Sequence, residues 1–125
     1  MSVYHDNVYD AALNYIKTNG VEAEVRESTA ILVDAITLDS GNYGTVMDND
    51  LGGGGRKMEC CVNDADDMLA IPVDAASTGS GADNVVIKNG AGDILAQADL
   101  LTPVELTTDD EINLDSFFAV LKDPT

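Results

Sequence analysis

"NVVIKNGAGDILAQADLL", residues 84–101, decides the fold class because it has the pattern of a β-hairpin. Its centre is the turn sequence "NGAG", residues 89–92, and Asn-Gly is strongly favoured in hairpin turns. On both sides of this turn apolar residues recur at every second position: Val85, Ile87, Ile94, Ala96 and Ala98. A period of two residues is typical of strands, so the stretch predicts two antiparallel strands joined by a short turn.

The rest of the chain continues this pattern outward from the hairpin. Towards the N-terminus, short apolar or alternating runs predict strands over residues 21–27, 30–38, 56–62 and 68–73. The first of these runs alternates apolar and charged residues, which indicates a half-exposed strand. Towards the C-terminus, "PVEL" and "INLDSFFAVLK" complete a set of seven or eight strands. In the last run, four residues of one parity are expected on one face: Ile112, Leu114, Phe118 and Val120.

The only clear helix is predicted over residues 8–19, with Asp6 or Asn7 as N-cap and Gly20 as the C-terminal stop. One helix beside many short strands indicates a mainly β protein, an antiparallel β-sandwich or jelly-roll-like domain with one N-terminal α-helix. We expect a single domain over residues 1–125, with a flexible arm over 1–7 and strands and loops over 21–125. The helix should dock on the sheet through an apolar stripe, with Leu13 at its edge: Val8, Ala12, Tyr15 and Ile16.

The composition indicates a folded domain with a strongly acidic surface. A chain of 125 residues with 45% hydrophobic residues can bury a core. Against 23 Asp and Glu stand only 6 Lys and Arg, which gives a net charge of -17. Nucleic acid and anionic membranes attract a basic surface, so we expect no direct nucleic-acid binding and no membrane contact.

"DNDLGGGGRKMECC", residues 48–61, is the stretch that most resembles an active site. A phosphate-binding loop needs Gly, four further residues and then Gly-Lys-Ser/Thr, whereas Arg56 follows the last glycine here and Met58 has no hydroxyl. A strand is predicted after the glycines, instead of the helix that would complete an anion site. The stretch therefore indicates a hinge-like glycine segment at the end of a long loop over 39–55. A second flexible loop is expected over 74–83.

Cys60 and Cys61 do not form a redox or metal motif. Successive strand residues point to opposite faces, and the only histidine, His5, is far away in the sequence. We expect Cys60 to pack as a small core residue and Cys61 to be a half-exposed thiol.

Acidic clusters at 48–50, 63–67 and 108–111 are interpreted as solvated turns, since none matches the twelve-residue calcium loop. A Ser-His-Asp site would depend on His5, and no G-x-S-x-G sequence is present. We therefore expect no enzyme activity, no cofactor and no metal. A calcium- or carbohydrate-binding β-sandwich module stays open as an alternative.

Four short motifs stand in order along the chain: "ALNYIKTN" at 12–19, "GRK" at 55–57, "LL" at 100–101 and "FAVLKDP" at 118–124. Together they resemble a family of small phage virion structural proteins. Its members have an "ALNYIKNN"-like helix, a central "GRK" strand, an "LL" strand and a final "F-x-I-x-I-x-DP"-like strand. The four-glycine run and the high acidity depart from that pattern. The resemblance implies a head decoration or tail-fibre-like component and carries no catalytic residues.

We therefore expect a non-enzymatic bacteriophage structural protein located in the virion and assembled in the host cytoplasm. The first hypothesis is a capsid decoration or cement protein that binds the major capsid protein and stabilises its lattice, as a homo-oligomer on the particle. The alternative within this class is a tail, baseplate or fibre-associated protein. Candidate partner contacts are the basic pair and three residues expected in an exposed loop: Arg56, Lys57, Tyr43, Val46 and Met47.

Overall fold

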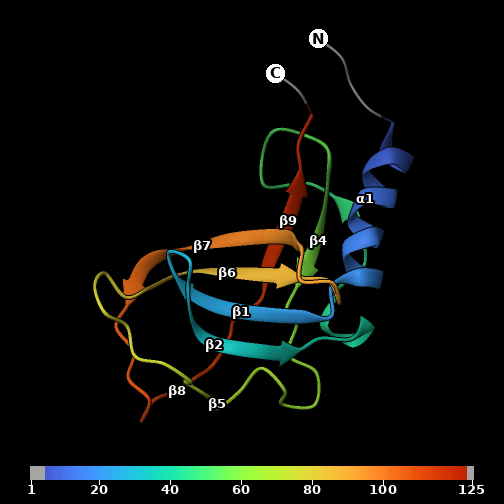
Figure 1. Ribbon diagram of the computed structural model, residues 1–125. Helices are drawn as coiled ribbons and strands as arrows, with labels where there is room; N and C mark the ends of the chain where they lie inside the picture. The colour runs from blue at the N-terminus through green and yellow to red at the C-terminus, as the bar shows by residue number, and fades with distance from the viewer. Residues whose placement is uncertain (1–4, 124–125) are drawn as a thin grey trace.

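The computed structural model describes residues 5–123, which form a mainly β domain with one N-terminal helix (Figure 1). All paired strands run antiparallel, which confirms the predicted fold class. The elements follow one another as α1 (Asp6–Asn19), β1 (Glu22–Glu27), β2 (Ala30–Thr37), η1 (Ser40–Asn42), β3 (Met47–Asp48), β4 (Arg56–Cys60), β5 (Ile71–Pro72), β6 (Ala82–Lys88), β7 (Ile94–Val104), β8 (Glu111–Ile112) and β9 (Phe117–Leu121).

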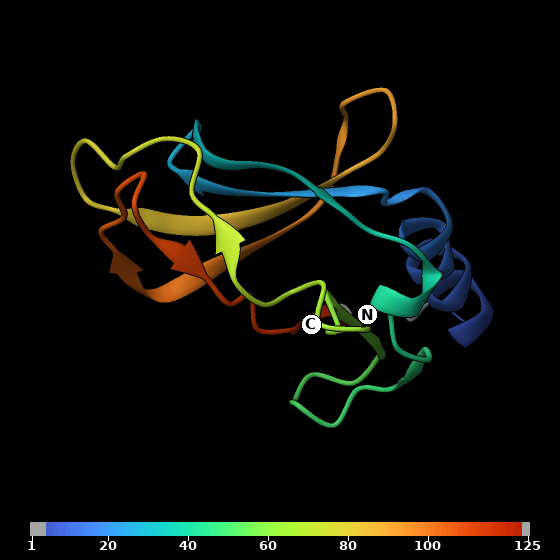
Figure 2. The same ribbon diagram turned by 90° about the horizontal axis from the view of Figure 1, so that it is seen from below.

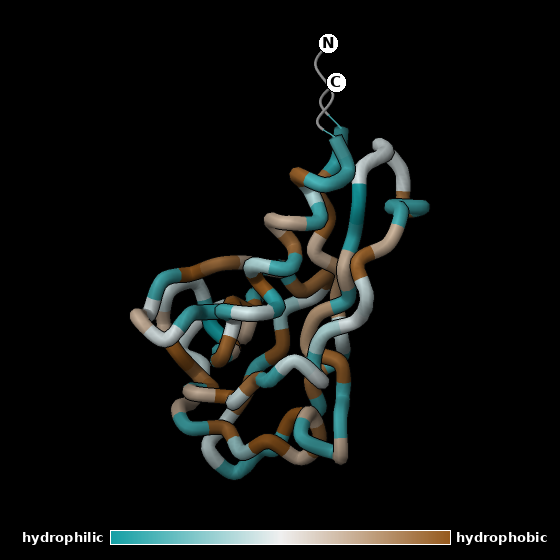
Figure 3. The backbone as a smooth tube through the Cα atoms, turned by 90° about the vertical axis from the view of Figure 1, so that its right-hand side faces the viewer, coloured by the Kyte–Doolittle hydropathy of each residue, from teal (hydrophilic) through white to brown (hydrophobic). Residues whose placement is uncertain are grey.

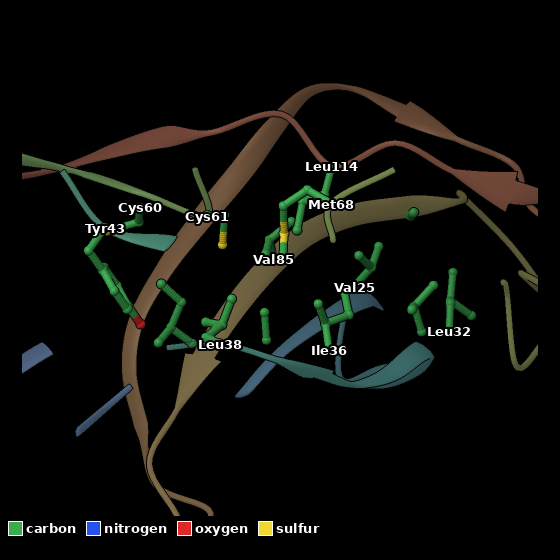
Figure 4. Close-up of a cluster of buried hydrophobic side chains, with 14 of the residues drawn as sticks. Val25, Leu32, Ile36, Leu38, Tyr43, Cys60, Cys61, Met68, Val85 and Leu114 are labelled. Atoms are coloured by element: carbon green, nitrogen blue, oxygen red, sulfur yellow. The ribbon is translucent and has the colours of Figure 1, made fainter. Parts of the chain in front are cut away.

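The domain is a lopsided sandwich. One layer is a four-stranded sheet with the order β2-β1-β6-β7. The three-stranded sheet β3-β4-β9 and the ribbon β5-β8 lie against one face of it (Figure 2). Between the layers, Val25 and Val85 of the large sheet point towards Met68 and Leu114 of the second layer (Figure 4). The hydrophobic core therefore fills the space between the two layers.

The predicted hairpin is present as β6 and β7. Val85 pairs with Ala98 and Ile87 with Ala96, so the alternating apolar residues share the face that covers the core. The Asn89 side chain closes the turn, because its Oδ1 accepts hydrogen bonds from the N–H groups of Ala91 at 3.0 Å and Asp93 at 2.9 Å.

The helix starts earlier than the sequence indicated. Its N-cap is His5, whose Nδ1 accepts a hydrogen bond from the Asn7 N–H at 3.1 Å, and not Asp6 or Asn7. Gly20 ends the helix as predicted, with its N–H bonded to the Ile16 carbonyl at 2.7 Å. Of the predicted arm, residues 1–4 lie outside the described residues, and 6–7 already belong to α1.

The docked face of α1 also differs from the prediction. Ile16 packs against the core as predicted, but the buried residues are Tyr9 and Leu13, whereas Val8 is 53% and Tyr15 56% exposed. The reason is that Tyr9 reaches the end of the chain, where its hydroxyl hydrogen-bonds the Asp123 carboxylate at 3.0 Å. This contact turns the face of the helix that carries Tyr9 and Leu13 towards the core.

The prediction of a half-exposed first strand is wrong for Glu24. Strand β1 lies between β2 and β6, and Glu24 is only 1% exposed. Its carboxylate accepts hydrogen bonds from Arg26 Nε and Lys88 Nζ, each at 2.9 Å. Burial alone would raise the pKa of Glu24, but the bonds to Lys88 and Arg26 outweigh it and lower that pKa. Long charged side chains thus cover this face of the central strand.

The expected common face of the last run is correct for Ile112 and Leu114, which pack in or against the core, but wrong for its second half. Residues 113–116 are not part of any strand, so the alternation is interrupted between β8 and β9. As a result Phe117, Ala119 and Leu121 pack against the core, and Phe118 is exposed. Within residues 5–123 the count rises to nine strands, because β3 was not predicted and the last run divides into β8 and β9, while part of the predicted "PVEL" strand belongs to β7.

The predicted loop 39–55 is interrupted by η1 and β3. Its remaining part, 49–55, projects from the same end of the molecule as the start of α1 (Figures 1 and 3). Asn49 organises this segment, since its Nδ2 donates to the carbonyls of Gly52 at 2.8 Å and Gly54 at 2.7 Å. The Asp123 N–H donates to Gly53 at 3.1 Å. The glycine segment is therefore bonded to the chain end, and its description as a simple hinge is incomplete.

The glycine-containing part of the loop over 74–83 is held by the carboxylate of Glu27. Glu27 is buried and accepts hydrogen bonds from the N–H groups of Thr78, Gly79 and Gly81, and from the Thr78 hydroxyl. The bonds from Thr78 and Gly81 lower the pKa of Glu27 from 4.5 to about 2.

This contact predicts an acid-sensitive contribution to stability. Because the pKa of Glu27 is lower in the folded chain, its contribution is complete above pH 4.5 and is lost as the pH falls towards 2. Glu27→Gln should lower the free energy of unfolding at pH 7 and flatten its decline between pH 4.5 and 2. Urea unfolding at several pH values measures both effects. Glu105→Gln, at an exposed position, is the control, and identical pH profiles for wild type and Glu27→Gln would contradict the assignment.

Candidate functional site

Arg56 is engaged within the domain. Its Nε lies 2.8 Å from Asp10 Oδ1 on α1, and its NH1 lies 2.7 Å from Asp48 Oδ1 on β3. The hydrogen bonds that the guanidinium donates to these two carboxylates raise its pKa. Arg56 therefore joins the helix to two strands, and a reversal of its charge would act on the fold as well as on any partner contact.

Lys57, the second member of the basic pair, is only 5% exposed. Its Nζ forms an ion pair with Asp50 and lies 4.3 Å from the centroid of the Phe118 ring. The bond to Lys57 lowers the pKa of the Asp50 carboxyl. Both cations of the predicted partner contact thus already have acidic partners inside the chain.

The three predicted loop contacts have different environments. Tyr43 is buried, and its hydroxyl donates a hydrogen bond of 2.7 Å to the Gly20 carbonyl. Tyr43 also forms an antiparallel bridge with Cys60, which explains why the expectation of an exposed side chain is wrong. Val46 is half-buried against the core, and Met47 is exposed. Of the three, only Met47 presents a large apolar surface.

The acidic clusters close turns. The Asp67 carboxylate accepts hydrogen bonds from the Asp64 N–H at 2.9 Å and from Asn42 Nδ2 at 2.7 Å. Asp110 accepts a hydrogen bond from the Thr107 N–H at 2.8 Å. Within residues 5–123, no group of three or more His, Cys, Asp or Glu side chains is arranged to hold a metal ion.

Both cysteines are buried free thiols. Cys60 packs in the core as predicted, but the expectation of a half-exposed Cys61 is wrong (Figure 4). Cys61 has a φ of 57°, so the backbone leaves the extended conformation directly after β4 and the alternation of faces no longer applies. Burial raises the pKa of Cys60 to about 11 and that of Cys61 to about 12. Both thiols are therefore protonated at neutral pH and poor nucleophiles.

A further candidate surface is an apolar cleft that the sequence did not predict. It has a volume of about 470 Å³ and lies where β7 and the segment 111–117 separate. Its floor is apolar and includes Val85, Ala98 and Leu114. Its lining also includes three exposed acidic residues: Asp99, Glu111 and Asp115. An apolar hollow with an acidic rim is suited to bind an apolar group that carries positive charge.

Strand β7 bulges beside this cleft. Asp99 pairs with Asn84 and Val104 with Ala82, so four residues of β7 face one residue of β6. The bulge contains Leu100, which lines the cleft, and Leu101, which is fully exposed. Bulges frequently re-aim a side chain next to functional sites. The "LL" pair was the sequence signal for this surface, but alternation alone would have placed one of the two leucines inside.

No family model, curated protein or solved structure matches the chain. Among residues 5–123, no helix has the length and apolar character needed to span a membrane. Function is therefore inferred from the chain's own residues and geometry.

Proposed function

We propose that this chain is a non-enzymatic structural subunit of a bacteriophage virion, a decoration protein that binds the major capsid lattice and stabilises it. The single observation that carries the proposal is that three of the four virion-like motifs meet in space. The helix motif lies on α1, "GRK" starts β4, and the last motif forms β9 and the residues after it.

Specific contacts hold together the elements that carry these three motifs. Arg56 bonds Asp10 and Asp123 bonds Tyr9, both in the first half of α1 just before the helix motif, and strand β4 pairs with β9 from Arg56↔Leu121 to Cys60↔Phe117. Segments more than 100 residues apart in the chain thus form one structural unit. In this chain the elements that carry the three motifs hold the domain together. This structural role agrees with the resemblance to virion structural proteins, which implies no catalytic residues.

The fourth motif supports an interaction role. Leu101 is fully exposed and takes no part in the core, whereas Leu100 packs against the core and also lines the cleft. Exposed apolar patches with polar rims often mark protein–protein contacts. On a lattice with many copies, modest contacts of each subunit add up through multivalency, which favours a decoration role for so small a domain.

Quantitative mass spectrometry of gradient-purified virions of the phage that encodes the chain tests the proposal. We expect the chain to remain with the particles through purification, with a copy number proportional to that of the major capsid protein. A low copy number that follows the tail proteins would favour the tail alternative, and absence from the particles would contradict a virion role.

A further inference from the structure

We propose that the cleft beside β7 binds an extended segment of a partner protein that adds to the β7 edge as a strand. The segment would place apolar side chains in the cleft and Lys or Arg side chains at its rim. This inference deepens the proposed function, on which it rests for the identity of the partner, because it names the surface through which the subunit holds a neighbouring virion protein.

The first observation is the free edge of β7. The strand spans Ile94–Val104 at the end of the large sheet, and within residues 5–123 the strand that pairs with it is β6 (Figure 1). The opposite edge is covered: Asp74 and Ala75 donate backbone hydrogen bonds to the Leu32 carbonyl, and the Asp34 N–H donates to the Asp74 carboxylate. An unpaired edge is the surface to which extended peptides add.

The second observation is the open hydrophobic space directly under that edge. Val25, Val85 and Ala98 of the large sheet and Leu114 and Phe117 of the second layer all line the cleft of about 470 Å³. An added strand would direct every second side chain towards these residues, since side chains alternate between the two faces of a sheet. Fully exposed Leu101 offers further apolar contact area beside the entering strand.

The third observation is the sign of the charge. Asp99, Glu111 and Asp115 line the cleft, and no described hydrogen bond or ion pair occupies their carboxylates within residues 5–123. Between Lys88 and Lys122 the sequence contains no Lys, Arg or His. Cationic side chains therefore complement the rim.

The same charges argue against a second copy of this chain as the occupant. Paired β7 edges would bring Asp99 and the rim acids Glu111 and Asp115 of one copy towards the same acids of the other, with no cation between residues 89 and 121 to compensate. Like charges opposite each other destabilise a strand pair. A different protein with a basic, apolar segment is the better match.

The probe is a soluble peptide of about eight residues that alternates valine and lysine, titrated into the isotopically labelled full chain. We expect backbone amide NMR shifts confined to Ile94–Val104 and residues 111–117, with affinity that falls as salt is added. Peptides that alternate valine with glutamate, or serine with lysine, are controls for charge and for apolar contact. Equal binding of either control, or shifts on another face, would overturn the proposal.

Two sets of variants test the rim and the bulge. Asp99→Lys with Asp115→Lys should weaken peptide binding by about tenfold or more. Asp34→Lys with Asp109→Lys makes the same change in net charge away from the cleft and should retain most of the affinity. Leu101→Ser, at a position fully exposed in the free chain, should weaken binding by about fivefold without affecting the fold.

Unchanged affinity in the Asp99 and Asp115 double variant or in Leu101→Ser would overturn the proposal, as would a dimer that shifts the β7 amides without peptide. If the double variant does not fold, the peptide affinity of Leu101→Ser still tests the proposal. The peptide experiment uses the isolated chain, so a lack of peptide binding would not contradict the proposed place in the virion. Conversely, absence of the chain from virions would not contradict peptide binding at the cleft.

Discussion

Gly55→Ala is expected to lower the free energy of unfolding by more than about 3 kcal/mol, whereas Gly52→Ala, in the same four-glycine run, should cost about 1 to 2 kcal/mol. Both glycines have positive φ, +84° at Gly55 and +109° at Gly52, so both variants carry backbone strain. Only at Gly55 would the added Cβ meet the backbone, at 1.8 Å from the Leu121 carbonyl oxygen. At Gly52 nothing lies within 4 Å.

Urea unfolding of the two variants, followed by circular dichroism, measures this difference. Because the substitution and the sign of φ are the same, Gly52→Ala is a matched control for backbone strain. Equal destabilisation by both variants would show that Gly55 does not pack closely against the end of β9. The expected difference gives the glycine run two separate roles, a close contact at its last residue and an open loop at its first.

Leu13→Ala should destabilise the domain by about 3 kcal/mol or more, the range expected when a fully buried leucine is truncated. Leu13 is 1% exposed and belongs to the face of α1 that packs on the core beside β4. The matched variant Val8→Ala removes apolar surface from the exposed face and should change stability by less than about 0.5 kcal/mol.

Denaturant unfolding of both helix variants discriminates between the two faces of α1. A larger loss for Val8→Ala than for Leu13→Ala would support the face predicted from the sequence and contradict the observed docking of the helix. Near-native unfolding of Leu13→Ala would show that α1 is not part of the cooperative core.

The parts of the fold that follow from local pattern were predictable. The β6–β7 hairpin is encoded by adjacent residues, because the alternation and the "NGAG" turn lie within one short stretch. Gly20 ended the helix as expected, since capping also depends on neighbouring residues.

The errors arose where distant residues determine the outcome. The inward face of α1 depends on Tyr9, whose partner Asp123 is 114 residues away, and the burial of Glu24 depends on Lys88, 64 residues away. A single backbone conformation at Cys61 reversed the expected direction of its side chain. No sequence pattern contains these contacts.

The surroundings of the candidate contact residues could not be predicted for the same reason. Arg56 and Lys57 stood out as rare cations, but their neutralisation by Asp10, Asp48 and Asp50 required the tertiary structure. The cleft combines β7 with residues 111–117, which the sequence presents as a hairpin strand and as the start of the last predicted strand. The "LL" pair at 100–101 was the only sequence feature that pointed to the cleft.

A density map of the virion at near-atomic resolution tests the central claim most directly. The account predicts that the domain is bound to the capsid lattice with the β7 edge and the cleft facing a capsid protein, and that an extended segment of that protein continues the large sheet beyond β7. A domain that is absent from the capsid, or bound to it through another face with the β7 edge open to solvent, would contradict the account.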